Sequence, residues 1–229
     1  ITEWLPVSST GHLILVGNVL KPGMSDAFME MFDVVIQLGA IMAVVVLYFH
    51  KLNPFSPTKT EKQKMLTWQM WFKVVIASVP AAIVGLLFND ILNEIFYKPL
   101  PVAIMLIVYG ILFIIIEKNN AGKTPSVTRI SQLNLQMLLW IGFFQMLALI
   151  PGTSRSGATI IGALIIGVSR EVAAEFTFFL AIPVMFGASL LKLIKFGFHF
   201  TGAEFGLLML GCIVSFGLSV VAIKFLMGY

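Results

Sequence analysis

Several polar side chains that could do chemistry stand close together near the start of an otherwise apolar chain. They are Glu3, Ser8, Ser9, Thr10 and His12. A carboxylate, three hydroxyls and an imidazole are costly to bury in apolar surroundings without a purpose. A helix that begins near Ser9 would place Ser9 and His12 on one face, as a nucleophile and a proton-transfer group. Ser8 or Ser9 is also a natural helix N-cap, which accounts for one serine but not for Glu3 and His12.

A second polar segment surrounds Arg155, inside another apolar stretch. An arginine within a membrane marks a substrate or ion site, and its flat guanidinium suits phosphate or carboxylate. A helix that begins near Ser156 would aim its free N–H groups at an anion. The other candidate ligand contacts here are Gly152, Ser154, Ser156, Gly157 and Thr159. The alternative is that Arg155 only pairs with Glu3 and holds the two segments together.

Together the two segments predict a site at the membrane midplane for an anionic group, above all phosphate. Arg155 and two helix N-termini would hold the anion, and the serine, histidine and glutamate side chains would face it. The residues alone leave two functions open. The protein could bind the anion and transport it, or it could catalyse a reaction on it.

The composition explains why a membrane must surround these segments. Hydrophobic residues make up 59% of the 229 residues and charged residues 11%, against about 25% charged in ordinary soluble domains. We therefore expect an all-α, polytopic integral membrane protein. The net charge of +4 is typical of cytoplasmic loops rather than of nucleic-acid binding, so no nucleic-acid partner is expected. Cys212 lies in an apolar run, where a small buried residue is the simplest interpretation.

Five segments are long and apolar enough to span the membrane. They are residues 27–50, 67–88, 97–116, 172–196 and 203–227. Residues 1–20 and 133–168 are interrupted by proline, glycine and polar residues, and broken backbone at membrane depth requires protein or water around it. We interpret both as re-entrant helical hairpins whose tips lie near the midplane.

The loop charges predict the orientation. Residues 50–64 carry four lysines against one acidic residue, and residues 117–132 carry three basic residues against one. The positive-inside rule places both loops in the cytoplasm and residues 89–98 outside. Lys192 and Lys195 then lie outside, against the rule. On this path the hairpin that carries Ser9 enters from outside and the hairpin that carries Arg155 enters from inside.

The two halves also look like an inverted repeat within a single membrane domain, 1–229. The first unit covers 1–116 and the second 133–229. The string LPVSSTG at 5–11 resembles IPGTSRSG at 150–157, and an apolar and then an acidic helix follow each. Inverted repeats with broken helices are typical of transporters. We expect one more helix after the second unit and one more hairpin arm before the first.

At these segments the chain resembles the undecaprenyl pyrophosphate phosphatase family, which is linked to bacitracin resistance. The strings that carry the resemblance are TEWLPVSSTGH at 2–12, PGTSRSGAT at 151–159, FDVVIQLG at 32–39 and GVSR at 167–170. The resemblance extends over essentially the whole chain. It implies hydrolysis of undecaprenyl pyrophosphate to the monophosphate and inorganic phosphate, which recycles the lipid carrier of bacterial cell-wall synthesis in the plasma membrane.

The resemblance also implies a divalent cation, Mg²⁺ or Ca²⁺, and an acidic motif of two carboxylates four residues apart. Glu3 matches the second carboxylate, and the first would precede Ile1. Glu3 is therefore the one candidate metal ligand. The partners implied are the lipid diphosphate and membrane lipid, and a homodimer is left open.

These observations combine into one hypothesis. Ser9 attacks the terminal phosphorus, with Ser8 as the alternative nucleophile, and His12 transfers the proton. Glu3 orients His12 or binds the metal, while Arg155 neutralises the phosphoryl oxygens. The expected substrate contacts are Ser8, Thr10, Gly152, Ser154, Ser156 and Thr159. The site is expected to open to the outer face. The rival hypothesis is a lipid-phosphate or anion transporter, or a flippase, that works without hydrolysis.

Overall fold

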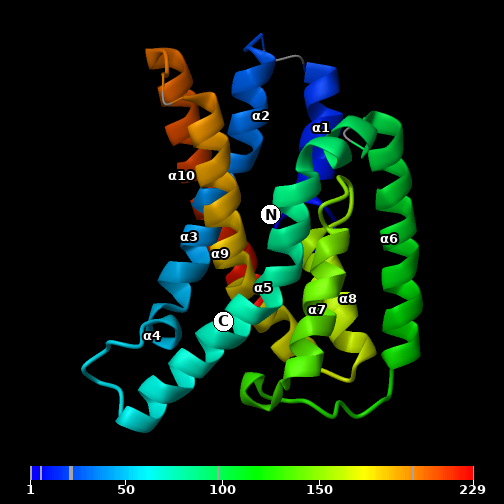
Figure 1. The fold of residues 1–229 in the computed structure, drawn as a ribbon, viewed down its shortest axis with the longest axis vertical. Coiled ribbons are helices and arrows are strands. Elements are labelled where there is room, and N and C mark those ends of the chain that lie inside the picture. The colour runs from blue at the N-terminus through cyan, green and yellow to red at the C-terminus, as the bar shows by residue number, and fades with distance from the viewer. Residues whose placement is uncertain (1, 6, 21–22, 97, 198, 229) are drawn as a thin grey trace.

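The computed structural model describes residues 2–5, 7–20, 23–96, 98–197 and 199–228, and these residues are mostly helical (Figure 1). The elements are α1 Ser9–Leu20, α2 Asp26–Val35, α3 Gln37–Leu47, α4 Phe49–Leu52, α5 Glu61–Phe96, α6 Pro99–Asn120, the 3₁₀ turn η1 Ile130–Gln132, α7 Leu135–Leu147, α8 Arg155–Ile165, α9 Arg170–Phe196 and α10 Gly202–Met227. The all-α prediction is confirmed.

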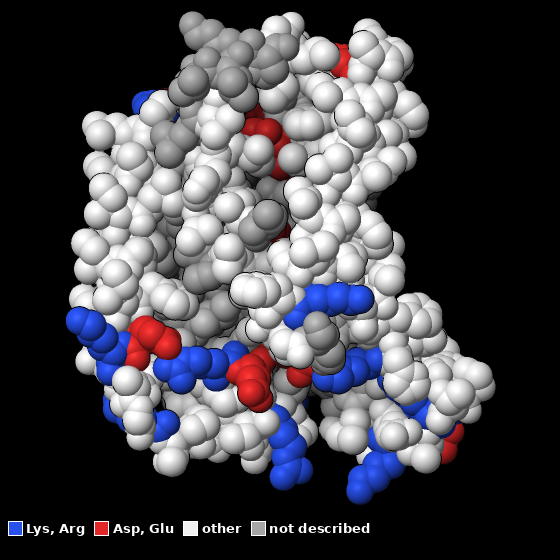
Figure 2. All heavy atoms as spheres, turned by 180° about the vertical axis from the view of Figure 1, so that it is seen from behind, with Lys and Arg blue, Asp and Glu red and all other residues white. Residues whose placement is uncertain are grey.

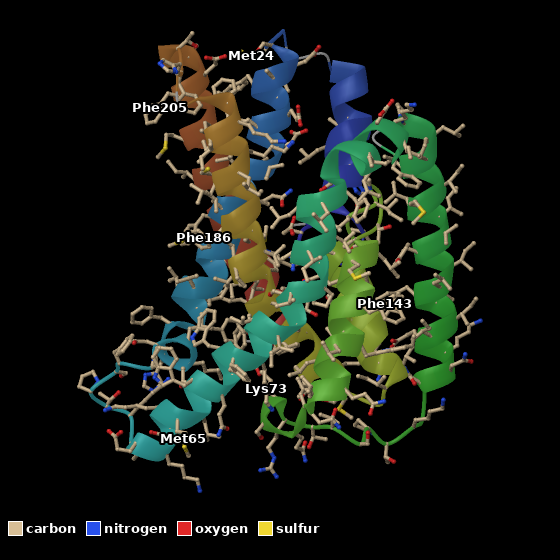
Figure 3. The ribbon with its side chains drawn as sticks, viewed as in Figure 1. Met24, Met65, Lys73, Phe143, Phe186 and Phe205 are labelled. Carbon is tan, nitrogen blue, oxygen red and sulfur yellow. The ribbon has the colours of Figure 1, made fainter. Side chains whose placement is uncertain are left out.

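The five predicted membrane spans are also confirmed. Five described segments are long and apolar enough to cross a bilayer: Asp26–Leu47, Glu61–Phe88, Pro99–Asn120, Arg170–Phe196 and Gly202–Met227. Large apolar side chains cover the outside of the bundle, such as Phe143 of α7, Phe186 of α9 and Phe205 of α10 (Figure 3). Such a surface is stable where lipid tails replace water as the solvent.

The helix that carries the second span is longer than the predicted span at both ends. The helix begins at Glu61 and continues to Phe96, through most of the segment that was expected to be a loop at 89–98. A few polar residues do not end a helix when no glycine or proline accompanies them. The chain breaks only before Pro99, which occupies the first turn of α6, because proline disfavours helix at the residue before it.

The helices α7 and α8 form an antiparallel pair joined by a turn near mid-height of the bundle (Figure 1). They contain 13 and 11 residues, so each is only about 16–20 Å long at 1.5 Å per residue. Neither could cross about 30 Å of hydrocarbon. This shape is what a re-entrant hairpin requires. Its position in a membrane, and the inverted repeat, stay predictions.

The long helix α9 lies at the centre of the packing. It contacts α2, α3, α5 and α8, and its buried residues Phe176, Phe178 and Phe179 belong to the main core. Trp4 joins this core: it is 2% exposed, and its ring meets Phe178 edge to face at 5.1 Å. The segment before α1 is therefore fixed against α9 by an aromatic contact.

Basic residues gather at one end of the molecule (Figure 2). The two loops that were predicted to be cytoplasmic lie at this end (Figure 1). Lys73 of α5 (Figure 3) donates from Nζ to the backbone carbonyls of Ile130, Ser131 and Leu133, at 2.7–2.9 Å. Lys73 thereby ties α5 to the loop that leads into α7.

Candidate active site

A cavity of about 140 Å³ lies where the start of α1, the α7–α8 turn, the start of α3 and the middle of α9 meet. Its lining residues are Thr2, Glu3, Ser8, Ser9, Thr10, Gln37, Ala148, Thr153, Ser154, Arg155, Ser156, Val184, Met185 and Ala188. Both polar segments found in the sequence therefore face one cavity. A space of this size holds several water molecules, at about 30 Å³ each.

The helix α1 begins at the expected serine, and the neighbouring serine caps it. The Ser8 Oγ accepts a hydrogen bond from the Gly11 backbone N–H at 3.1 Å. Ser8 is 3% exposed and has a φ of 59°, in the left-handed region that costs a non-glycine residue on the order of 1–3 kcal/mol. The Ser8 hydroxyl therefore caps α1, and both Ser8 and Ser9 line the cavity, so the choice of Ser9 over Ser8 as nucleophile stays a prediction.

Glu3 links the two polar segments. The Ser9 Oγ donates a hydrogen bond to Glu3 Oε2, and Arg155 Nη2 donates to Glu3 Oε1 at 2.9 Å. The Glu3 and Arg155 side chains are only 11% and 14% exposed, so the charges interact in a medium less polar than water. Ser9 therefore has a carboxylate that can accept its proton, and that carboxylate is held in place by a cation.

The guanidinium of Arg155 has one end free for a ligand. Its Nη2 serves Glu3 and lies 3.6 Å from the Met185 sulfur. Its Nη1 is buried and makes no hydrogen bond within the described residues. A buried donor without a partner is costly, and a phosphate oxygen in the cavity would satisfy it. The ion pair with Glu3 and the phosphate contact are therefore compatible roles.

The helix α8 presents its N-terminus to the same cavity. The Ser154 Oγ caps it by accepting from the Gly157 N–H at 3.1 Å. The Ser156 Oγ donates to the backbone carbonyls of Glu3 and Leu5, at 3.2 and 3.3 Å, and so holds the N-terminal segment against α8. The remaining first-turn N–H groups of α8 favour an anion at this point.

His12 lies apart from this arrangement. Its side chain is exposed and is not among the cavity residues. Its Nδ1 is 2.8 Å from the Ser8 backbone oxygen, and because that oxygen only accepts, the neutral ring carries its proton on Nδ1. The structure therefore pairs Ser9 with Glu3, where the sequence suggested His12.

Two of the expected substrate contacts also lie outside the cavity lining. The Thr159 hydroxyl is fully buried and bonds to Thr177 Oγ1 at 2.9 Å and to carbonyls of its own helix. Gly152 has a φ of 94°, and a Cβ there would lie 2.5 Å from the Val102 carbonyl oxygen. The close approach that Gly152 permits is therefore to α6, and Thr159 joins α8 to α9.

Other cavity residues were not predicted from the sequence. Gln37 and Thr153 contribute polar groups, whereas Val184, Met185 and Ala188 form an apolar wall on α9. A glutamine within a span is itself a signal, since its amide must find partners in hydrocarbon. The wall on α9 could not be found in this way, because its residues are ordinary for a span.

The site does not by itself fit a divalent cation held by protein ligands. Among the described residues that line the cavity, Glu3 alone has a carboxylate, and its two oxygens already accept from Ser9 and Arg155. Among the described residues no group of three histidine, cysteine, aspartate or glutamate side chains is placed to hold a metal. We therefore derive no chemical step from a cation.

Known proteins match this sequence over its whole length. The model of the family described as bacitracin resistance protein BacA matches residues 1–229. Proteins named undecaprenyl-diphosphatase are 60% identical in Desulfitobacterium hafniense, Acetivibrio thermocellus and Enterococcus faecalis. Each comparison covers 100% of this chain and 83–84% of the relative. The segments that build the cavity are thus part of a match that runs from end to end, and the chain belongs to the bacitracin resistance protein BacA family.

Proposed function

We propose that this protein is a membrane phosphatase that hydrolyses undecaprenyl pyrophosphate to undecaprenyl phosphate and inorganic phosphate. The relatives named undecaprenyl-diphosphatase support the substrate. The observation that carries the chemistry is the chain of contacts from Ser9 to Glu3 to Arg155 in one cavity. It joins a nucleophile, a proton acceptor and a phosphate-binding cation.

In the first step the Ser9 Oγ attacks the terminal phosphorus. The O–P bond forms while the bond from this phosphorus to the bridging oxygen breaks, and the bridging oxygen leaves on the lipid monophosphate. The serine proton passes to Glu3. The Arg155 Nη1 and the N-terminus of α8 neutralise charge on the transferred phosphoryl group, which is the larger part of catalysis in phosphoryl transfer.

The apolar wall supports a position for the lipid. Val184, Met185 and Ala188 line the cavity from α9, so the first isoprene units would contact α9 while the diphosphate faces Arg155. The rest of the tail would leave sideways between helices. Lipid tails are as apolar as the outer faces of these helices.

We further propose a bacterial plasma-membrane location with the site opening to the outer face. The support is the basic end of the molecule (Figure 2), which the positive-inside rule places in the cytoplasm. The site would then receive the diphosphate on the side where wall assembly leaves it. The divalent cation, Mg²⁺ or Ca²⁺, also stays a proposal.

The test is phosphate release from the C55 lipid diphosphate by the purified protein in detergent. Wild-type protein should release inorganic phosphate, and Ser9→Ala should lose at least about 10³-fold in kcat, as expected when a nucleophile is removed. Ser78→Ala is the matched control, since the Ser78 hydroxyl only bonds to the Val74 carbonyl within α5 at 2.8 Å. Absence of phosphate release by the wild-type protein would refute the proposed function. Full activity of Ser9→Ala would refute the nucleophile alone.

A further inference from the structure

Gln37 is a polar cavity residue to which the first step gives no role. It is the first residue of α3 and lines the cavity together with Glu3, Ser9 and Arg155. It comes from a different part of the fold than the other polar groups, which belong to the N-terminal segment and the α7–α8 turn. A half-buried amide beside the reacting groups requires an explanation.

The break between α2 and α3 determines which atom of Gln37 is available. Ile36 ends α2 and begins α3. In a continuous helix the Asp33 carbonyl would accept from the backbone N–H of residue 37. Here it accepts from the Gln37 side-chain Nε2 at 3.2 Å. Because the Nε2 end of the amide satisfies this carbonyl, Gln37 can offer the cavity its acceptor Oε1 and the second N–H of Nε2.

The Gln37 Oε1 acceptor needs a hydrogen-bond donor in the cavity, and the diphosphate substrate does not supply one. Ionised phosphates only accept hydrogen bonds, and the Ser9 hydroxyl is already donated to Glu3. Arg155 Nη2 is shared between Glu3 and Met185, and Nη1 is the donor that we assign to the phosphate. The α3 N-terminus also has no side-chain cap, and of its first N–H groups the Gly39 N–H donates to the Ile36 carbonyl at 3.1 Å. A water molecule both donates and accepts hydrogen bonds, so it is a suitable partner for Gln37 Oε1 in a polar cavity of this size.

We propose that Gln37 Oε1 holds and orients the water that hydrolyses the phosphorylated Ser9. This inference rests on the proposed function, because it requires a phosphoserine intermediate. The water oxygen bonds to phosphorus while the bond between phosphorus and the Ser9 Oγ breaks. One water proton passes to Glu3, the proton that Glu3 took in the first step returns to the Ser9 Oγ, and the other water proton stays on the departing phosphate. The proton left on Glu3 then passes to solvent as the phosphate departs, which restores the carboxylate. An amide that orients an attacking water is a known device in phosphoryl transfer.

The competing explanation is that Gln37 only satisfies the Asp33 carbonyl at the helix break. Two substitutions separate the explanations. Gln37→Leu removes both the acceptor and the donor, whereas Gln37→Glu keeps an acceptor oxygen but, as a carboxylate, cannot donate to the Asp33 carbonyl. If Gln37 holds water, Gln37→Glu should dephosphorylate faster than Gln37→Leu. If Gln37 only caps the break, both variants should be equally impaired.

The experiment follows protein-bound label from a lipid diphosphate that carries ³²P in its terminal phosphate. The purified chain is mixed with substrate in detergent, quenched in acid, and counted for label on protein and in free phosphate. Gln37→Leu should form the phosphoenzyme at the wild-type rate but accumulate it, and phosphate release should fall about 100-fold, the loss typical of a misplaced reactant. Gln69→Leu is the matched control, since Gln69 is exposed on α5 and lines no part of this cavity.

The outcomes distinguish the inference from the function on which it rests. Phosphoenzyme that accumulates in Gln37→Leu, with partial recovery in Gln37→Glu, supports the inference. Wild-type turnover in Gln37→Leu, equal slowing of both steps, or equal impairment of the Leu and Glu variants overturns it and leaves Ser9 as the nucleophile. Slow phosphate release by Gln37→Leu without any protein-bound label overturns both the phosphoserine intermediate and the inference, while the phosphatase function stands.

Discussion

Replacing Arg155 by lysine separates the two contacts that this arginine can make. In the structure Nη2 bonds to Glu3 Oε1 at 2.9 Å while Nη1 is buried without a hydrogen-bond partner. Lysine keeps the positive charge but concentrates it in one ammonium group on a flexible stem. That group can pair with Glu3 or approach the phosphate, but it does not reproduce the fixed fork that reaches both. We therefore expect a catalytic defect in a protein that remains folded.

The expected loss of kcat follows from removing one oriented hydrogen-bond donor from the charge that develops on the phosphoryl oxygens. Such losses cost about 10²–10³ in kcat, or about 2.7–4 kcal/mol. The effect on stability should be small, since lysine can still neutralise the buried carboxylate. Arg155→Met is the contrasting variant: it leaves Glu3 buried and unpaired, and breaking a buried pair in this way costs about 3–5 kcal/mol.

The assay is phosphate release from the lipid diphosphate, with thermal unfolding in detergent measured on the same preparations. Arg170→Lys is the matched control. Arg170 pairs with Glu117 at 2.6 Å, with side chains 57% and 43% exposed, and should retain wild-type activity. A value of kcat/KM for Arg155→Lys close to that of the wild type would show that Arg155 is not a phosphate clamp. If Arg155→Lys had the same lowered Tm as Arg155→Met, the arginine would be needed mainly for folding.

Two further predictions concern His12 and the topology. His12→Ala should lower kcat by less than about tenfold, because the ring lies outside the cavity lining and its Nδ1 is bonded to the Ser8 backbone; a loss of about 10²–10⁴ would identify His12 as the proton-transfer group after all. In a Cys212→Ala background, Ser25→Cys should react with a membrane-impermeant thiol reagent added to intact cells and Thr60→Cys should not. Ser25 caps α2 and Thr60 directly precedes α5, and the starts of these helices lie at opposite ends of the bundle, near the labelled Met24 and Met65 (Figure 3). The reverse labelling pattern would invert the topology and place the chemistry on the cytoplasmic side.

The elements that position the site were predictable because local signals specify them. A serine followed by a break in the apolar pattern is a strong N-cap signal, and α1 and α8 begin at Ser9 and Arg155, each with a serine cap. The spans follow from length and hydropathy alone. The end of α5 was missed because it has no local signal before Pro99.

The pairing within the site depends on contacts that no local pattern encodes. Glu3 and Arg155 are separated by 152 positions in the sequence. Glu3 also lies before α1, so helical spacing does not predict the direction in which its side chain points. That direction is set by Trp4 against Phe178 and by the Ser156 hydrogen bonds to the N-terminal segment. Helical spacing pointed from Ser9 to His12, and tertiary packing instead directs Ser9 to Glu3.

The same long-range contacts explain why an arginine is tolerated at this depth. A buried ion pair seldom stabilises a fold by itself, because removing two charges from water costs as much as their attraction returns. Here Glu3 is satisfied at both oxygens, by Ser9 and Arg155, whereas Arg155 Nη1 has no hydrogen-bond partner in the part of the chain that the structure describes. The Nη1 donor is therefore the group that the proposed phosphate contact would use, and that contact would offset the cost of burying it.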